Sequence, residues 1–440
     1  MTPDSRLSYA EAIAGLAERG RFGIRMGLGR VERLMAEVGR PDLQLRGALV
    51  GGTNGKGSVV AMARAVLAES GCRIGTMPKP HLISYRERIA IDGQPITEDE
   101  FASAVAAVLP AADRISAIEG PPTEFEVLTA VAIGELARRR VDLALVEVGM
   151  GGRLDATNVL DLGVAAITNV QRDHEAHLGS TLTAIGTEKA AIIKRGNLAV
   201  TGATGRGVRP ILDRCASLHV PLRRAGGPGS YQAEVRSVDW DGTTLDAWTP
   251  AGELRDIRLG LIGAHQAANA AVTLALLDAV AERFGLPVDE RQIRRGLSAA
   301  RWPGRLELLD ARRIGLRRVL LDGAHNPDGA RALATALHDL GVERPTIVFG
   351  AMRDKRVGAV LGALAPLAPR FIFTAVDDPH ALGPAELAAA WRRAGGAAAE
   401  TATTPQDAMA MADADLVIVA GSLYLVGAVR GMITGQAGSA

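Results

Sequence analysis

The sequence predicts an α/β protein built on parallel sheets, and two observations carry this prediction. Short apolar runs alternate along the chain with segments whose apolar residues recur at helical spacing, which is the pattern of parallel strands with crossover helices. A glycine-rich turn, residues 52–58, separates the first clear apolar run from a helical segment. Such a turn is typical of folds that hold phosphate groups at the start of a helix.

The composition is that of an ordinary globular protein. The chain has 440 residues, 48% hydrophobic and 22% charged, which suggests two or three domains. The 50 basic and 49 acidic residues nearly cancel, so no nucleic-acid partner is expected. Cys72 and Cys215 make neither a disulfide framework nor a zinc site. A charged N-terminus, and no apolar run near the roughly 20 residues of a membrane span, predict a cytoplasmic protein without a membrane partner.

The elements of the first half follow from this pattern. We expect strands at 47–50, 141–146 and 164–167, and a helix at 58–70 with Gly71 as its C-cap. The segment 231–257 alternates in polarity and contains turn residues, which predicts a small antiparallel addition.

A second α/β unit begins near Trp302. Its expected strands are 318–321, 346–349, 371–373 and 416–419, with helices at 327–340 and 384–394. We therefore predict two domains, residues 1–300 and residues 301–440.

The turn Gly52-Thr-Asn-Gly-Lys-Gly-Ser58 predicts a nucleotide site. Its glycines allow backbone N–H groups to approach phosphate oxygens, and Lys56 adds a positive charge. Ser58 offers a hydroxyl group to Mg²⁺. The turn departs from the common phosphate-loop pattern because Gly57 separates the lysine from the serine.

Charged residues follow the next two predicted strands. Glu147 stands at the carboxyl end of one, where α/β nucleotide enzymes hold Mg²⁺. His174 follows the other, and a lone histidine is more often structural than metal-binding. Lys189, taken by itself, would be an exposed helix lysine.

Three segments together resemble the folylpolyglutamate synthase/dihydrofolate synthase family, within the Mur-ligase superfamily. They are residues 52–58, residues 147–158 and Asp322-Gly-Ala-His-Asn-Pro327. The agreement extends over essentially the whole chain and includes residues 21–28, 123–126, 263–269, 302–305, 354–355 and 421–424.

The resemblance implies a Mur-ligase-like fold, with a P-loop ATPase domain and a smaller Rossmann-like C-terminal domain around a reactive cleft. It also implies ATP and Mg²⁺ as cofactors and a carbamylated Lys189. The implied catalytic residues are Lys56, His174, Lys189 and Arg305; the ATP-binding residues are Gly52, Thr53, Asn54, Gly55, Lys56, Gly57, Ser58, Asn269, Arg305, Asp322 and His325; the metal ligands are Ser58, Glu147 and His174; the substrate-binding residues are His81, Arg88, Phe125 and Asp155.

The implied reaction is ATP-dependent addition of L-glutamate to dihydropteroate, a reduced folate, or both, through an acyl phosphate. Its partners are these small molecules, and the resemblance favours a monomer. Two alternatives stay open: a ligase redirected to another carboxylate and amino acid, and a regulatory ATPase without ligation. Arg305 and residues 322–326 in the second half favour a two-domain catalyst over a simple switch.

Two positions depart from the family pattern. Pro78-Lys-Pro-His81 stands where the family has Thr-Ser-Pro-His, whose serine helps to hold magnesium. Either the metal is held differently, or Lys79 takes over part of a cation's electrostatic role, or Lys79 points to solvent. Arg172 replaces a small or apolar residue, and it either contacts an anion near the metal site or faces away.

Overall fold

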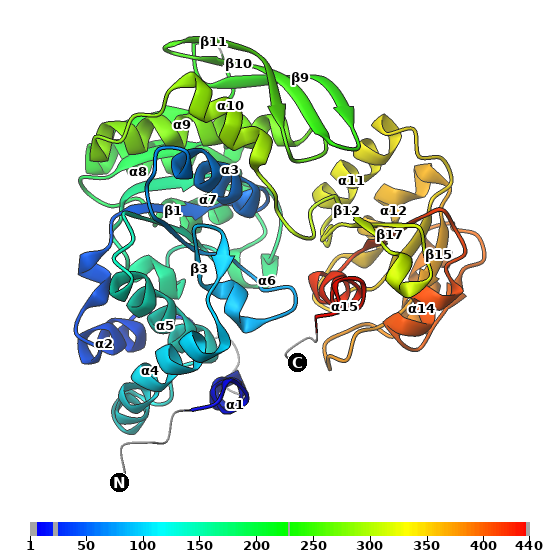
Figure 1. Cartoon of the computed structure of the whole chain (residues 1–440), viewed down its shortest axis with the longest axis horizontal. Coiled ribbons are helices and arrows are strands. Elements are labelled where there is room, and N and C mark those ends of the chain that lie inside the picture. The colour runs from blue at the N-terminus through cyan, green and yellow to red at the C-terminus, as the bar shows by residue number, and fades with distance from the viewer. Residues whose placement is uncertain (1–6, 21–24, 228, 437–440) are drawn as a thin grey trace.

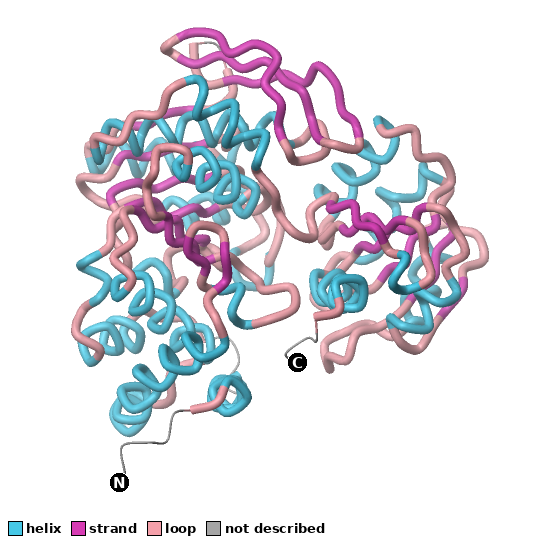
Figure 2. The backbone as a smooth tube through the Cα atoms, in the orientation of Figure 1, coloured by secondary structure: helices cyan, strands magenta, loops and turns pink. Residues whose placement is uncertain are grey.

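The computed structural model describes residues 7–20, 25–227 and 229–436, and arranges them as two α/β bodies joined by a smaller sheet (Figure 1). Residues 21–24, which begin one of the segments that resemble the family, lie outside the described residues. Figure 2 shows that the strands of each body form an inner layer with helices around it.

The first body is built on a mostly parallel sheet. Its central strand β1 pairs in parallel with β5 and β6, in a register that places Val50 opposite Glu147 and Gly51 opposite Ile167. The carboxyl ends of these strands therefore meet at one edge, where an α/β fold places its ligands. Across the described sheet the order is β4 (Gln94–Pro95), β3 (Ala90–Ile91), β2 (Ile74–Met77), β5 (Leu143–Glu147), β1 (Gly47–Gly51), β6 (Gly163–Ile167), β7 (Leu198–Thr201) and β8 (Leu222–Arg224).

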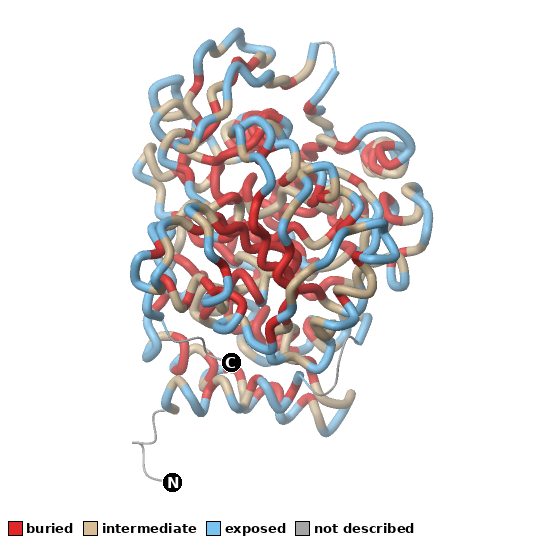
Figure 3. The backbone as a smooth tube through the Cα atoms, turned by 90° about the vertical axis from the view of Figure 1, so that its right-hand side faces the viewer, coloured by how far each residue is buried: buried red, intermediate tan, exposed pale blue. Residues whose placement is uncertain are grey.

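Helices cover both faces of this sheet. One face of the sheet forms a hydrophobic cluster with helices α3, α9 and α10. The other face forms a second cluster, to which α1, α2, α4 and α5 contribute. Figure 3 shows the buried residues concentrated in the middle of the molecule. The helices are α1 (Tyr9–Gly20), α2 (Gly29–Glu37), α3 (Lys56–Ala68), α4 (Glu98–Glu119), α5 (Glu124–Arg138), α6 (Glu175–Leu178), α7 (Leu182–Ala190), α8 (Arg209–Leu218), α9 (Gln266–Phe284) and α10 (Glu290–Ala299).

Among the described helices, α4 is the one long and apolar enough, by length and composition, to cross a membrane. Asp113 and Arg114 interrupt its apolar residues, so α4 is not an uninterrupted apolar run of that length. Phe101, Val105, Val108 and Ile115 of α4 are buried in the core that α1 and α5 share with it. These four residues therefore belong to the core of the first body.

The antiparallel addition bridges the two bodies. It consists of β9 (Gln232–Asp239), β10 (Gly242–Thr249) and β11 (Gly252–Leu259), and Figure 1 shows it along one side of both bodies. Leu245 and Ile257 are buried in the core of the first body. Val238 and Trp240 pack against the core of the second, and Trp240 lies under the guanidinium of Arg318 at 5.5 Å.

The second body has its own sheet, in which β12 is antiparallel to its neighbour and the other described strands are parallel. Separate hydrophobic clusters fill its two faces. The strand order is β12 (Glu307–Asp310), β13 (Arg318–Leu321), β17 (Leu416–Ala420), β14 (Thr346–Phe349), β15 (Arg370–Phe373) and β16 (Glu400–Thr401), and the helices are α11 (Pro327–Asp339), α12 (Val357–Leu364), α13 (Pro384–Arg393), α14 (Pro405–Met411) and α15 (Leu423–Thr434).

The predicted strands and helices are confirmed, with small shifts at their ends. The largest shift concerns the helix expected at 58–70, which begins at Lys56 and ends at Ala68. After Ala68 the backbone N–H groups of Glu69, Ser70 and Gly71 bond to carbonyls three residues back, so the last turn tightens before Gly71. Gly71 therefore lies beyond the cap, with φ 77°.

Candidate active site

A cavity of about 1080 Å³ lies between the two bodies, and residues from both line it. With one exception, His81, every residue predicted for the site lines this cavity. Thus the first body contributes the predicted residues Gly52, Thr53, Asn54, Gly55, Lys56, Gly57, Ser58, Arg88, Phe125, Glu147, Asp155, His174, Lys189 and Asn269, and the second contributes Arg305, Asp322 and His325.

The glycine-rich turn is held in place by the end of β6. The side-chain oxygen of Asn169 accepts hydrogen bonds from the backbone N–H groups of Thr53 and Asn54, at 3.1 and 3.0 Å. The Thr53 hydroxyl exchanges two further bonds with the backbone of Gln171. The turn is thereby fixed against the sheet, with the N-terminus of α3 behind it and facing the cavity.

Two glycines in the turn adopt backbone conformations that other residues rarely adopt. Gly52 has φ 143° and Gly55 has φ 81°. A side chain would also collide with Thr168 at the first position and with Asn269 at the second. Packing against protein side chains therefore requires glycine at both positions, and the predicted approach of their backbone to phosphate oxygens stays a prediction.

Two lysines converge on the carbonyl oxygen of Gly52. Lys56 Nζ donates to it at 3.2 Å, and Lys189 Nζ donates to it at 2.9 Å from helix α7. Lys189 is buried, with 3% of its surface exposed, so the expectation of an exposed helix lysine is wrong. Burial, together with the charge of Lys56, lowers the pKa of Lys189 to about 7.

The three predicted metal ligands line the cavity beside Lys56. Ser58 and Glu147 are buried, and Glu147 Oε1 lies 4.0 Å from Lys56 Nζ. Burial raises the pKa of Glu147 and lowers the pKa of His174 to about 4, so this histidine is neutral near pH 7. The carboxylate and the hydroxyl are oxygen donors of the kind that Mg²⁺ prefers, whereas the imidazole nitrogen is a less usual ligand for this ion. In the described ranges, no three His, Cys, Asp or Glu side chains cluster as a metal site by themselves.

The second body presents a buried carboxylate and a cation to the same cavity. Asp322 accepts hydrogen bonds from the backbone N–H groups of Leu306 and Ala324, at 3.0 and 2.9 Å, and burial raises its pKa. Arg305 lies near enough for its charge to oppose that rise. On the opposite side, the Asn269 amide donates to Gln266 at 2.8 Å under Gly55.

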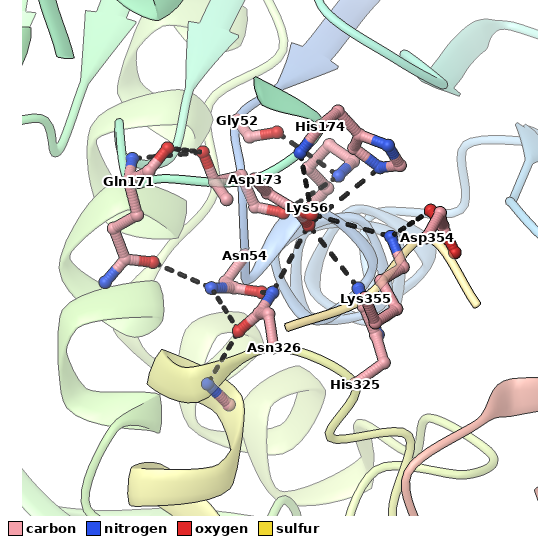
Figure 4. Close-up of polar contacts among 12 residues, drawn as sticks. Gly52, Asn54, Lys56, Gln171, Asp173, His174, His325, Asn326, Asp354 and Lys355 are labelled. Carbon is pink, nitrogen blue, oxygen red and sulfur yellow. Dashed lines mark hydrogen bonds and ion pairs between the residues drawn. The ribbon is translucent and has the colours of Figure 1, made fainter. Parts of the chain in front are cut away.

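Asp173 joins the two bodies across the cavity, and it was missed as a site residue (Figure 4). Its carboxylate lies 3.5 Å from His325 Nε2 and 3.5 Å from Lys355 Nζ, and it accepts a bond from Asn326 at 3.3 Å. Burial would raise the pKa of Asp173, but the contact with His325 and the charge of Lys355 outweigh it and hold that pKa well below its usual range.

A second contact between the bodies joins two amides. Asn326 Nδ2 donates to Asn54 Oδ1 at 3.0 Å, which ties the start of α11 to the glycine-rich turn (Figure 4). Asn326 and Lys355 lie in segments that resemble the family, and that position was the only signal for them. Asp173 lies in none of those segments, and no chemical reason in the sequence alone distinguished it.

The predicted substrate residues occupy the other end of the cavity. Arg88 Nε donates to His81 Nδ1 at 2.8 Å, so His81 contacts the cavity wall through Arg88. Burial, with the nearby charge of Arg88, lowers the pKa of His81 to about 3. Asp155 accepts bonds from the N–H groups of Met150 and Thr157, both at 3.0 Å.

The two departures from the family pattern have different outcomes. The Lys79 side chain is only 7% exposed and lines the cavity, so an orientation toward solvent is wrong. The Arg172 side chain is 56% exposed, pairs with Glu175 at 3.9 Å and does not line the cavity, so it faces away.

Comparisons with known proteins agree with this geometry. Residues 50–277 match the Mur ligase middle domain, and residues 304–423 match the Mur ligase glutamate ligase domain. The dihydrofolate synthase/folylpolyglutamate synthase of Bacillus subtilis is 32% identical over 96% of this chain and 98% of the relative. The chain spans only 50% of a Haloferax volcanii relative, a probable bifunctional folylpolyglutamate synthase/dihydropteroate synthase, at 35% identity.

Solved structures resemble the whole chain. A Mycobacterium tuberculosis folylpolyglutamate synthase complexed with ADP is 33% identical, with a TM-score of 0.86 over 96% of this chain and 99% of that one. E. coli FolC in complex with DHPP and ADP is 28% identical, with a TM-score of 0.84 over 99% of this chain and 100% of that one. These likenesses confirm the predicted Mur-ligase fold.

Proposed function

The chain belongs to the dihydrofolate synthase/folylpolyglutamate synthase family of ATP-dependent acid–amino-acid ligases, and we propose that it adds L-glutamate to dihydropteroate, to a reduced folate, or to both. One observation carries the proposal: the glycine-rich turn of the first body and Arg305 and Asp322 of the second line the same cavity. A ligase needs this arrangement, because ATP and the carboxylate must react where water cannot compete.

The proposed chemistry has two steps. An oxygen of the substrate carboxylate attacks the γ-phosphorus of ATP, the bond from that phosphorus to the bridging oxygen breaks, and ADP leaves. The amine of glutamate then attacks the acyl carbon, inorganic phosphate leaves with the former carboxylate oxygen, and the nitrogen loses a proton. Lys56, the N–H groups of residues 52–58, and Arg305 would offset negative charge on the transferred phosphoryl group.

Metal binding forms a separate part of the proposal. Ser58, Glu147 and His174 would hold Mg²⁺, which when bound supplies positive charge beside the ATP phosphates. The remaining nucleotide contacts would come from Asn269, Asp322 and His325, and substrate contacts from His81, Arg88, Phe125 and Asp155.

Carbamylation of Lys189 also belongs to the proposal. The buried amine has a pKa of about 7, so a large fraction is neutral at physiological pH and able to attack CO₂. The product is a carbamate, with release of one proton. This change would replace a cation beside Gly52 with an anion that can support a metal site.

We further propose that residues 1–300 and 301–440 act as two domains that close on the substrates, and that the protein works as a cytoplasmic monomer with no nucleic-acid or membrane partner. Opening and closing would take place at the segment 302–305, which connects the domains.

The test is ADP release by the purified protein with Mg-ATP and glutamate. We expect stimulation by dihydropteroate, tetrahydrofolate or both, and little release without either acid. ADP release that is the same with and without either acid would instead support a regulatory ATPase. ADP release that depends only on another carboxylate and amine would support a redirected ligase.

A further inference from the structure

Lys79 is a buried ammonium group without a hydrogen-bond partner among the described residues. Its nearest carboxylate oxygen, Asp155 Oδ1, is 3.7 Å away, beyond hydrogen-bond distance. The Nζ atom lies 3.6 Å from the centre of the Phe125 ring, a cation–π contact. Burying an ammonium without hydrogen bonds destabilises a fold, so stability does not explain this lysine.

The neighbouring carboxylates are committed elsewhere. Asp155 Oδ1 accepts from both the backbone and the hydroxyl of Thr157, at 3.0 and 2.5 Å, and Oδ2 accepts from Met150 N–H at 3.0 Å. Glu147 Oε2 accepts from the backbone N–H of Lys79, at 3.2 Å, and leaves the ammonium itself unbonded. The three N–H donors of Lys79 therefore remain for a molecule in the cavity.

The position of Lys79 limits what that molecule is. On one side Glu147 connects it to Lys56 and the glycine-rich turn, and on the other the Phe125 ring gives an apolar surface. Gly149 lies beside this group, and a Cβ there would touch Lys79 Nζ and Phe125 Cζ at 3.4 Å and come within 2.8 Å of Asp155 Oδ2, which is too close. A ligand that reaches from the aromatic surface to the turn must pass the ammonium.

We propose that Lys79 binds the substrate carboxylate that receives the phosphoryl group. This inference rests on the proposed ligase function and assigns its acid-recognition group. The ammonium donates to the carboxylate oxygens and offsets their charge, which lets the anion approach the anionic phosphates of ATP. Lys79 is therefore a specificity-determining residue that distinguishes an acid from a neutral molecule of the same shape.

The test compares Lys79→Met with the wild type by calorimetric titration, with the ATP analogue AMPPCP and Mg²⁺ present. The two probes are dihydropteroate and its carboxamide, which keeps the shape but lacks the charge. We expect Lys79→Met to bind the acid about 10- to 100-fold more weakly, while the carboxamide and AMPPCP bind as before. Lys79→Arg should recover part of the loss, because it restores the charge.

A matched control separates this role from a structural one. Lys194→Met removes a partly buried ammonium, but Lys194 donates to the carbonyl of Asn158 at 2.7 Å and does not line the cavity. It should bind both probes like the wild type and melt at a lower temperature. Lys79→Met leaves the Asp155 carboxylate without the cation 3.7 Å away, so it too should melt at a lower temperature, but of the two variants it alone should lose affinity for the acid.

Three outcomes would overturn the inference. Equal weakening of acid and carboxamide would show a role in shape alone, and weaker AMPPCP binding with unchanged acid binding would assign Lys79 to the nucleotide. Unchanged binding of all probes would show no role in recognition. A wild type that binds AMPPCP but neither dihydropteroate nor tetrahydrofolate would instead overturn the proposed function itself.

Discussion

The indole of Trp302 lies against Gly57 so closely that a Cβ added to the glycine would be 2.5 Å from Trp302 Cε2. Gly57 is the second residue of helix α3, directly after Lys56, and Trp302 lies in the segment that connects the two bodies. This contact explains why a glycine separates Lys56 from Ser58 in this turn. It also links the position of the connecting segment to the conformation of the nucleotide site.

Replacing Gly57 by alanine should therefore disturb both the position of the connecting segment and the conformation of the nucleotide site. We expect a loss of about 1–3 kcal/mol in the free energy of unfolding, since the added methyl group overpacks the contact, together with slower ADP release. Thermal denaturation and the ADP assay measure the two effects. Gly134→Ala in α5 is the control, because its Cβ would meet nothing within 4 Å, and it should be as stable as the wild type or more so. If both variants behave alike, the contact has no energetic weight.

Lys56→Ala should abolish ADP release at saturating substrates. The ammonium is held by the carbonyls of Gly52 and Thr53, both at 3.2 Å, and its removal takes away the cation that the glycine-rich turn itself carries. Arg209→Ala, which breaks an exposed pair with Asp213, is the control and should retain full activity. Near-normal turnover by Lys56→Ala would remove the turn from the catalytic site.

Local sequence patterns predicted the glycine-rich turn, Glu147 and the strands, because each depends on residues close together along the chain. The environments of Lys79 and Lys189 could not be predicted in this way. Lys189 looks like an exposed helix residue until the fold brings it to the carbonyl of Gly52, 137 positions away. Lys79 lies between prolines and is buried only because Phe125 and Gly149 close around it.

The contacts between the two bodies could not be predicted from the sequence either. Asn326 and Asp173 are 153 positions apart, and their hydrogen bond exists only because the connecting segment sets the bodies at one particular angle. The family resemblance identified the segment that contains Asn326, but none of its segments contains Asp173. Side-chain partners across a cavity depend on tertiary placement rather than on periodicity.

The pKa of Lys189 predicts how activity depends on pH and bicarbonate. Its folded-state pKa of about 7 lies below its ordinary value of 10.5, so the buried amine is mostly neutral at pH 8 and mostly charged at pH 6. Only the neutral amine reacts with CO₂. With bicarbonate limiting, we expect ADP release to fall about tenfold from pH 8 to pH 6. Intact mass measurement should show the added CO₂ at pH 8.

The lowered pKa of Lys189 should make the free energy of unfolding rise with pH. Between about pH 7 and pH 10.5 the unfolded chain holds the proton and the folded chain does not, so in CO₂-free buffer stability rises with pH in this window. Lys189→Met lacks this contribution and serves as the control.

Lys189→Ala should lose activity and regain part of it with short carboxylates. Full activity of Lys189→Ala without any carboxylate would count against the carbamate.

Asp173→Asn should weaken the closed arrangement of the two bodies. The substitution keeps the shape of the side chain but removes the charge that faces His325 and Lys355, each at 3.5 Å. We expect a loss of roughly 1–3 kcal/mol from the contact, because these bonds involve charged partners in a largely buried place. The readouts are a larger radius of gyration with ADP bound, measured by X-ray scattering, and a higher KM for ATP.

The control for this prediction is Asp354→Asn. Asp354 pairs with the same Lys355, at 3.2 Å, but both residues belong to the second body, and the Asp354 side chain is 60% exposed. Its loss removes an ion pair from the same lysine without touching a contact between bodies, so the radius of gyration should not change. If Asp173→Asn and Asp354→Asn give the same scattering profile, Asp173 does not hold the bodies together. The coupling would then come from other contacts between the bodies, such as the Asn54–Asn326 hydrogen bond at 3.0 Å and the Glu175–Arg356 ion pair at 3.9 Å.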